Sequence, residues 1–121
     1  MNDNRRREIR IRSVNLTNYS RLRQPDHPEE PEAYEVLGLA QTKDLSASGC
    51  RLLTREPLPV GVGLRLDLQL GPTIVTCEGE VVRAAKEGGL WSLGVEFHEL
   101  EEVAQDGIRA YLQFKEGAEE A

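Results

Sequence analysis

The chain has 121 residues, of which 39% are apolar and 30% charged, and its net charge is −6. This size fits one domain with a core of its own. No apolar stretch approaches the ~18 residues of a membrane span, and no apolar segment follows the N-terminus as it does in a secretory signal. We therefore expect a cytoplasmic protein without membrane insertion, whose Cys50 and Cys77 are buried and reduced.

The net charge hides a strong asymmetry along the chain. Residues 1–24 hold seven arginines against two acidic residues, a net +5. Residues 25–121 hold eight basic against nineteen acidic residues, a net −11. The acidic body disfavours binding to a nucleic acid polymer, whereas the basic start favours a local site for an anion.

The first half of the chain reads as an arm followed by short strands. Residues 1–12 lack apolar periodicity and are expected to form a flexible arginine-rich arm. Residues 14–22 predict a first strand, and residues 24–32 predict a linker because three prolines and four acids exclude a central strand. Residues 34–42 predict a second strand, residues 44–49 a polar turn, and residues 50–54 a third strand.

The second half carries the clearest strand pattern. Leucines alternate with polar residues over 64–70, and further alternating segments follow at 74–83 and 91–97. Together with the first three strands, these segments predict a mainly β fold, a six-stranded antiparallel barrel with one apolar face turned inward. The barrel with its C-terminal helix is expected to span residues 13–115, and residues 116–121 to fray.

The apolar period changes after His98. One stripe at i, i+3, i+4 and i+7 spacing predicts an amphipathic helix that packs across one opening of the barrel. Its apolar members are Leu100, Val103, Ala104, Gly107, Ile108, Tyr111 and Leu112. Gly107 costs a helix ~1 kcal/mol relative to alanine, so we expect it where the helix passes closest to the barrel.

Two remote polar segments could form one ligand site. The first is Arg6-Arg7-Glu8-Ile9-Arg10, an RxxxR pattern, and the second is Asp44-Leu45-Ser46-Ala47-Ser48-Gly49, a DxSxxG pattern. An arginine can hold a phosphate, or the N7/O6 edge of guanine, with two donors at once. A carboxylate can accept from the N–H groups of the other guanine edge, and glycine lets a ligand approach the backbone.

In this order, with strands around them, the two motifs resemble the PilZ domain family over residues 5–114. The resemblance implies a bacterial signal-transduction receptor for cyclic di-GMP built on a PilZ-type six-stranded β-barrel. It implies that Arg6 and Arg10 grip phosphates and guanine faces. It further implies that Asp44 and Ser46 bind a guanine edge or phosphate, that Gly49 leaves room, and that Arg5 favours a stacked pair of ligands.

The resemblance also implies a non-catalytic protein that signals to an effector protein in trans. No cofactor beyond the ligand, no metal site and no catalytic residues are expected, because no Ser/His/Asp or Cys/His arrangement and no metal-ligand spacing is found. Two other functions stay open from the residues alone. They are a PilZ-like interaction adaptor that binds no nucleotide, and a small nucleic-acid-binding barrel that uses the basic arm.

The motif residues also have purely structural interpretations. Asp44 and Ser46 could cap a turn through bonds to the backbone. Gly49 could serve only as a turn residue with positive φ. Ser48 is expected to contribute to the turn alone.

Overall fold

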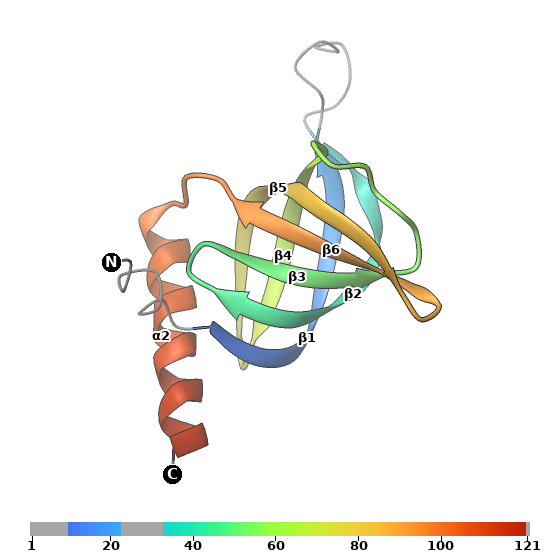
Figure 1. The fold of residues 1–121 in the computed structure, drawn as a ribbon. Coiled ribbons are helices and arrows are strands. Elements are labelled where there is room, and N and C mark those ends of the chain that lie inside the picture. Colours follow the sequence, from blue (N-terminus) through green and yellow to red (C-terminus); the bar gives the residue numbers. More distant parts are fainter. Residues whose placement is uncertain (1–9, 23–32, 121) are drawn as a thin grey trace, which may run out of the picture.

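The computed structural model describes residues 10–22 and 33–120, which form a closed β-barrel with one helix beside it (Figure 1). The strands are β1 (Arg10–Leu22), β2 (Ala33–Ser46), β3 (Gly49–Thr54), β4 (Gly63–Leu70), β5 (Thr73–Glu87) and β6 (Leu90–Phe97). They follow the order β1-β2-β3-β6-β5-β4 around the barrel, and all neighbours are antiparallel. The expected six-stranded antiparallel barrel with a C-terminal helix is confirmed.

Several strands are longer than the sequence pattern indicated. Strand β1 begins at Arg10, so residues 10–12 belong to the barrel wall, whereas residues 5 and 6 lie outside the described part of the chain. Strand β2 continues through Asp44 to Ser46, and β5 continues to Glu87. The bend between β2 and β3 is therefore only Ala47 and Ser48. The expectation of a turn over 44–49 was wrong, because hydrogen bonding to β1 and β3 carries the strand past the polar residues.

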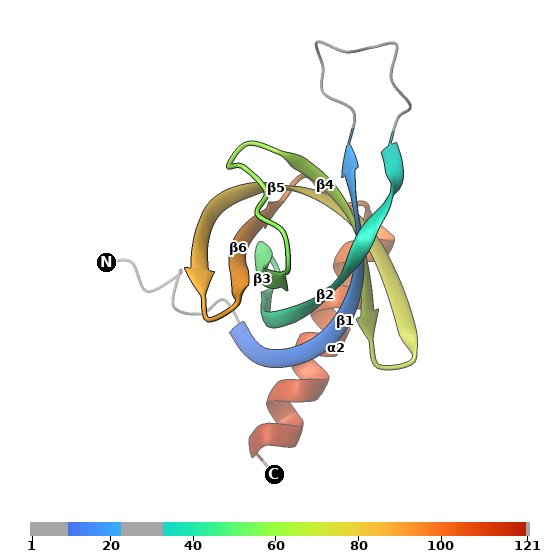
Figure 2. The same cartoon turned by 90° about the vertical axis from the view of Figure 1, so that its right-hand side faces the viewer.

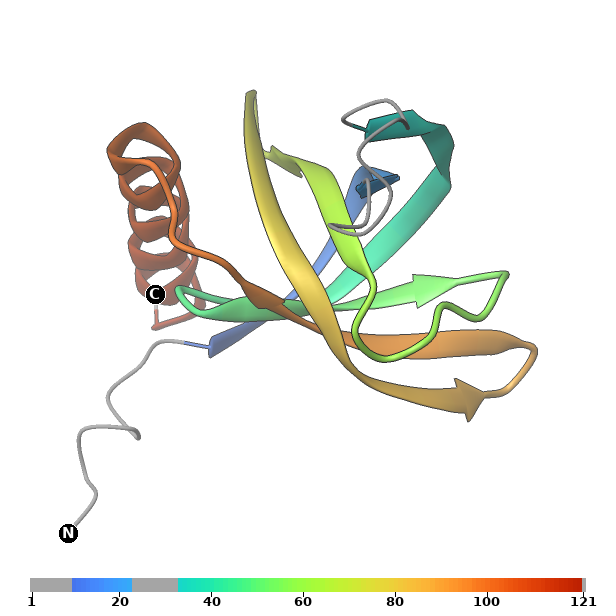
Figure 3. The same cartoon turned by 90° about the horizontal axis from the view of Figure 1, so that it is seen from above.

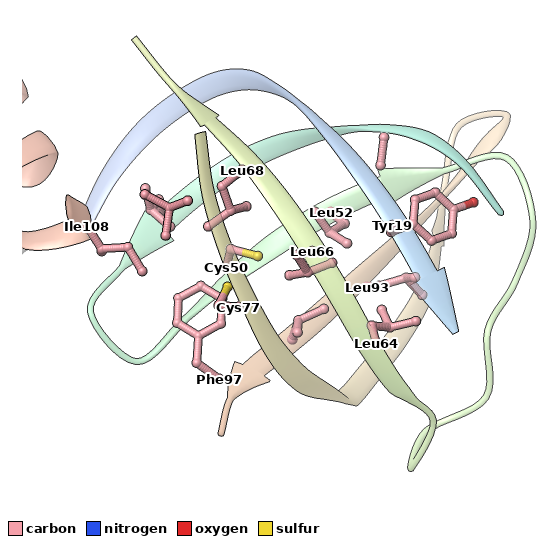
Figure 4. Packing of buried hydrophobic residues seen from close by; sticks show 14 of the residues in the cluster. Tyr19, Cys50, Leu52, Leu64, Leu66, Leu68, Cys77, Leu93, Phe97 and Ile108 are labelled. Atoms are coloured by element: carbon pink, nitrogen blue, oxygen red, sulfur yellow. The ribbon is translucent and has the colours of Figure 1, made fainter. Parts of the chain in front are cut away.

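The barrel interior is filled by side chains from alternate positions of the strands. On β4, Leu64, Leu66 and Leu68 are fully buried and Leu70 is 3% exposed, as the period of two predicted. Figure 2 shows the strands arranged in a ring around the space that these side chains occupy. Figure 4 shows leucines from β3, β4 and β6 meeting Tyr19 and Phe97, with Cys50 and Cys77 side by side near one end of the core. Both cysteines are buried free thiols, as expected.

One buried polar contact crosses between β1 and β2. The hydroxyls of Thr17 and Thr42 lie 2.6 Å apart and both side chains are fully buried. One hydroxyl donates to the other, so neither is buried without a partner, which would cost free energy.

Helix α2 (Glu102–Glu120) lies across one end of the barrel, where it contacts β5, β1 and β2. Ala104, Ile108 and Leu112 form its buried stripe, and a Cβ atom at Gly107 would lie 2.9 Å from a methyl group of Val75. Gly107 thus sits at a close approach to the barrel, as expected. Val103 is 84% exposed, so its assignment to the inward stripe was wrong; it lies one residue, or about 100°, from Ala104 around the helix.

The bend between β2 and β3 lies at the same end of the barrel as α2 in both Figure 1 and Figure 3. This end therefore brings together the DxSxxG segment, the start of β1 and the helix. Within the described residues, α2 does not have the run of apolar residues that a membrane-crossing helix needs.

Candidate ligand-binding site

A β-bulge at Lys43 turns Asp44 to the outer face of the barrel. Thr42 pairs with Leu52 and Asp44 pairs with Arg51, so β2 has one extra residue between these pairs. Strict alternation would place Asp44 on the same face as the buried Thr42. The extra residue reverses the phase, so that Asp44 points outward while Leu45 points into the core.

Asp44 is held by a basic partner from the next strand. Arg51 Nε donates to Asp44 Oδ2 at 2.9 Å, and Arg51 Nη1 donates to Glu87 Oε1 at 3.0 Å. One guanidinium therefore bridges a carboxylate on β2 and a carboxylate on β5. This contact orients Asp44 and leaves its second oxygen for a further donor. Arg51 was not among the residues expected in the site.

Ser46 is nearly buried and holds the bend. Its hydroxyl accepts from the backbone N–H of Ser48 at 3.3 Å, donates to the Gly49 carbonyl at 3.3 Å, and lies 3.3 Å from the Ser48 hydroxyl. With 2% of its surface exposed, Ser46 has a clear structural role at the end of β2.

Gly49 begins β3 where two backbones come unusually close. It does not have a positive φ, since only Gly61, Gly71 and Gly88 do among the described glycines. A Cβ atom at Gly49 would overlap the Val95 carbonyl oxygen of β6. Close backbone approach, rather than turn conformation, therefore requires glycine here, and the positive-φ interpretation was wrong.

A second β-bulge, on β5, has the same effect as the first. Val81 pairs with Val95 and Arg83 pairs with Gly94, so Val82 is the extra residue. Val81 is fully buried, and without the bulge Arg83 would follow it to the inside. The bulge places Arg83 on the outer face instead.

The two bulges align a row of residues across five strands. In register, Arg12 faces Asp44, Asp44 faces Arg51, Arg51 faces Gly94, and Gly94 faces Arg83. We call these five residues the outer row. Adjacent strands lie about 4.8 Å apart, so the row brings together positions that are distant in sequence.

Four residues of the outer row, all but Arg12, line a depression of about 160 Å³ on the barrel wall. It is lined by Asp44, Leu45, Ser46, Ser48, Gly49, Cys50, Arg51, Val82, Arg83, Gly94, Val95 and Glu96. The depression thus contains the whole DxSxxG pattern apart from Ala47, together with two arginines that the sequence analysis did not assign to it.

The last residue of the RxxxR pattern is paired with a residue that lines this depression. Arg10 is paired with Ser46 in the β1–β2 register, two residues from the pair of Arg12 with Asp44. The backbone of Arg10 therefore lies beside the DxSxxG segment. Arg5 and Arg6 lie outside the described residues.

A second depression of about 330 Å³ lies between β4, β5 and the start of α2. Its lining includes Glu78, Glu99 and Glu101 beside Arg65 and His98. This excess of carboxylates opposes an anionic ligand. In the described ranges, 10–22 and 33–120, no three Cys, His, Asp or Glu side chains cluster as metal ligands would.

Comparison with known proteins agrees with this architecture. The family described as "PilZ domain" matches residues 4–114. The chain is similar to the inhibitor of motility MotI/DgrA of Bacillus subtilis, with 18% identity, a TM-score of 0.70, and coverage of 91% of this chain and 50% of that one. It is also similar to the PilZ domain of YcgR from Escherichia coli, solved with c-di-GMP, with 18% identity, a TM-score of 0.63, and coverage of 96% and 95%.

A third similar structure is MrkH of K. pneumonia in complex with c-di-GMP. It has 22% identity and a TM-score of 0.59, with coverage of 88% of this chain and 49% of that one. The chain thus spans about half the length of MotI and MrkH. No curated protein sequence matches the chain.

Proposed function

The chain belongs to the PilZ domain family, a family of cyclic di-GMP receptors, and we propose that it binds cyclic di-GMP at the depression on its barrel wall. The observation that carries the proposal is the β1–β2 register. It sets Arg10, the last residue of RxxxR, opposite Ser46 of DxSxxG, with Asp44 two residues away on the same strand. The last residue of one motif thereby lies beside the other motif, although the two are remote in sequence.

The proposed roles follow the chemistry of each group. Arg6 and Arg10 bind phosphate oxygens and guanine faces through their planar forks. The free oxygen of Asp44 accepts from the N–H groups of a guanine, since Arg51 already occupies Oδ2.

The remaining motif residues act mainly on the backbone. Ser46 fixes the bend from which the backbone faces the ligand. Gly49 has no side chain that would keep the ligand away from the backbone at this bend, and Arg5 favours a stacked pair of ligands.

The energies are compatible with useful affinity. Micromolar binding corresponds to ~8 kcal/mol, and one bidentate contact to a base contributes ~1–3 kcal/mol. Ordering each residue of an arm costs ~1–2 kcal/mol. Base contacts alone therefore do not suffice, and phosphate contacts must add to them, so loss of one arginine is expected to remove micromolar affinity.

We propose that the output passes to an effector protein in trans. A ligand can shift such an interaction only if it binds one state of the receptor more tightly than another. The start of β1, the β2–β3 bend and α2 lie at one end of the barrel. Ligand bound beside this bend would therefore change a surface that includes the helix. PilZ domains are generally non-catalytic, and no reaction is proposed.

One specific observation favours the alternative, an interaction adaptor that does not bind nucleotide. Both polar side chains of DxSxxG already have partners in the protein, Arg51 for Asp44 and the bend for Ser46. In an adaptor these contacts would serve the fold alone.

Calorimetric titration with cyclic di-GMP decides between the two functions. We expect micromolar or tighter binding by the full chain, loss of binding in Arg10→Ala, and weaker binding in Asp44→Ala. Arg109→Ala removes a positive charge from α2 and serves as the matched control. Absence of binding by the unmodified chain would favour the adaptor, and unchanged affinity in both motif variants would place the ligand elsewhere.

A further inference from the structure

Arg83 occupies the far end of the outer row from the RxxxR motif. It lies on β5, three strands away from Asp44 on β2, and it lines the same depression. At about 4.8 Å per strand, these two positions are roughly 14 Å apart along the wall. The ligand proposed above has two anionic groups and two bases, so it offers binding groups to residues at both ends of the depression.

The bulge at Val82 places the side chain of Arg83 on the outer face of the barrel. Val81, just before the bulge, is fully buried opposite Val95, and Arg83, just after it, is exposed opposite Gly94. A regular strand would direct the guanidinium toward the apolar core, at a large cost in desolvation. Bulges that re-aim a side chain occur frequently next to binding sites.

Gly94 provides the space that Arg83 uses. A Cβ atom at Gly94 would lie 3.2 Å from Cβ, 3.3 Å from Nε and 3.3 Å from Nη2 of Arg83. The arginine side chain therefore lies flat across the glycine, between β5 and β3. A Cβ atom at position 94 would be tight against this side chain, so Arg83 would have to shift by a few tenths of an ångström.

No neighbour in the described part of the chain neutralises the charge of Arg83. Arg51, the other arginine of the depression, is paired with Asp44 and Glu87. Within residues 10–22 and 33–120, no carboxylate lies within ion-pair distance of Arg83, and it makes no hydrogen bond. Glu96 also lines the depression, but in register it faces Gly49 and Glu80 rather than Arg83.

From this geometry we propose that Arg83 is a further ligand-binding residue, which holds a phosphate or a guanine edge of cyclic di-GMP at the β5 side of the depression. The inference rests on the proposed function. A free planar fork can bind either group with two donors. Because Arg83 has no ion pair with another described residue, binding breaks no ion pair within that part of the chain. The β5–β6 hairpin thereby becomes a third part of the site, next to RxxxR and DxSxxG.

Calorimetric titration of Arg83→Ala, Arg83→Lys and Gly94→Ala with cyclic di-GMP tests the inference, with Arg109→Ala as the control for charge. We expect Arg83→Ala to weaken binding about ten- to a hundredfold and Arg109→Ala to change it by less than about twofold. Arg83→Lys retains the charge but loses the fork, so its affinity should fall between those of Arg83→Ala and the unmodified chain. Gly94→Ala should weaken binding because it displaces Arg83.

The outcomes separate this inference from the proposed function. If the chain binds, Arg10→Ala abolishes binding, and Arg83→Ala behaves like Arg109→Ala, then the role of Arg83 is refuted and the function stands. If the unmodified chain does not bind, both fail together. Thermal unfolding accompanies the titrations. Because Arg83 is exposed and has no ion pair with the residues that the structure describes, its variants should unfold within about 1–2 °C of the parent, as expected for a surface substitution.

Discussion

Arg51 Nε donates a hydrogen bond of 2.9 Å to Asp44 Oδ2, across the β2–β3 pair on the outer wall of the barrel. This contact fixes the carboxylate that we expect to read guanine. Both side chains are about one-third to one-quarter exposed, at 33% and 26%. The pair should therefore matter more for the orientation of Asp44 than for the stability of the fold.

Arg51→Ala is the first test of this relationship. We expect cyclic di-GMP affinity to fall about three- to tenfold, because Asp44 loses its orientation, while the free energy of unfolding changes by about 1 kcal/mol or less. Calorimetry and urea unfolding measure the two quantities. A tighter complex would show instead that Arg51 competes with the ligand for Asp44.

Gly49→Ala should destabilise the barrel. Its Cβ would overlap the Val95 carbonyl oxygen, so β3 and β6 must separate; overpacking of this kind costs about 1–3 kcal/mol. Gly89→Ala is the matched control, since nothing lies within 4 Å of its Cβ position and its φ is not positive. Equal unfolding midpoints in urea for the two variants would contradict the prediction.

The buried Thr17–Thr42 pair should behave non-additively. Thr42→Val leaves the Thr17 hydroxyl buried without its 2.6 Å partner and should cost about 1–3 kcal/mol. The double variant Thr17→Val, Thr42→Val removes both polar groups and should recover part of that loss. A double-mutant cycle in urea measures the coupling, and simple additivity would mean that the hydroxyls do not depend on each other.

The two core cysteines should make stability depend on pH above the physiological range. Burial, followed by Asp67 and Glu78, raises the pKa of Cys77 from 9.0 to about 12. Burial and the neighbouring Cys77 raise the pKa of Cys50 as well. The unfolded chain therefore releases thiol protons near pH 9 that the native state retains, so stability present below pH 9 is lost as pH rises toward 12.

Urea unfolding at pH 8 and at pH 10.5 measures this loss, which reaches at most about 1.4 kcal/mol per pH unit for each thiol. The variant Cys50→Ala, Cys77→Ala is the control and should show a flatter pH dependence. In the native parent at pH 8, a thiol reagent should label the cysteines only as fast as the barrel opens. Rapid labelling would show that the thiols are accessible in the folded state.

The sequence predicted those parts of the fold that depend on local periodicity. The alternation at Leu64–Leu70 predicted β4 and its buried face, and the stripe through Ala104, Ile108 and Leu112 predicted the packing of α2. In each case the side chains themselves repeat with the period of the element. Close approach at Gly107 also followed, since a glycine inside an amphipathic helix needs a packing reason.

The parts that could not be predicted depend on pairing between strands. The polar residues at 44 and 46 resemble a turn in sequence, and only their ladders with β1 and β3 show them to be strand. Likewise, Arg51, Gly94 and Arg83 become candidate site residues only because the strand register aligns them with Asp44. This alignment depends on the extra residues Lys43 and Val82. A bulge has no reliable signal in one sequence, because its cause lies in the register of the partner strand.

The bulge at Val82 lets β5 hold one residue more than its partner strand without an exchange of its two faces. Val82 is 44% exposed, so its substitution should leave the inside and the outside of the barrel unchanged. Deletion of that one residue would restore regular alternation, with Val81 still inside and Arg83, then its direct neighbour, still outside. Position 82 is therefore the point on β5 at which a change of chain length is absorbed and is not passed on to the residues beyond it.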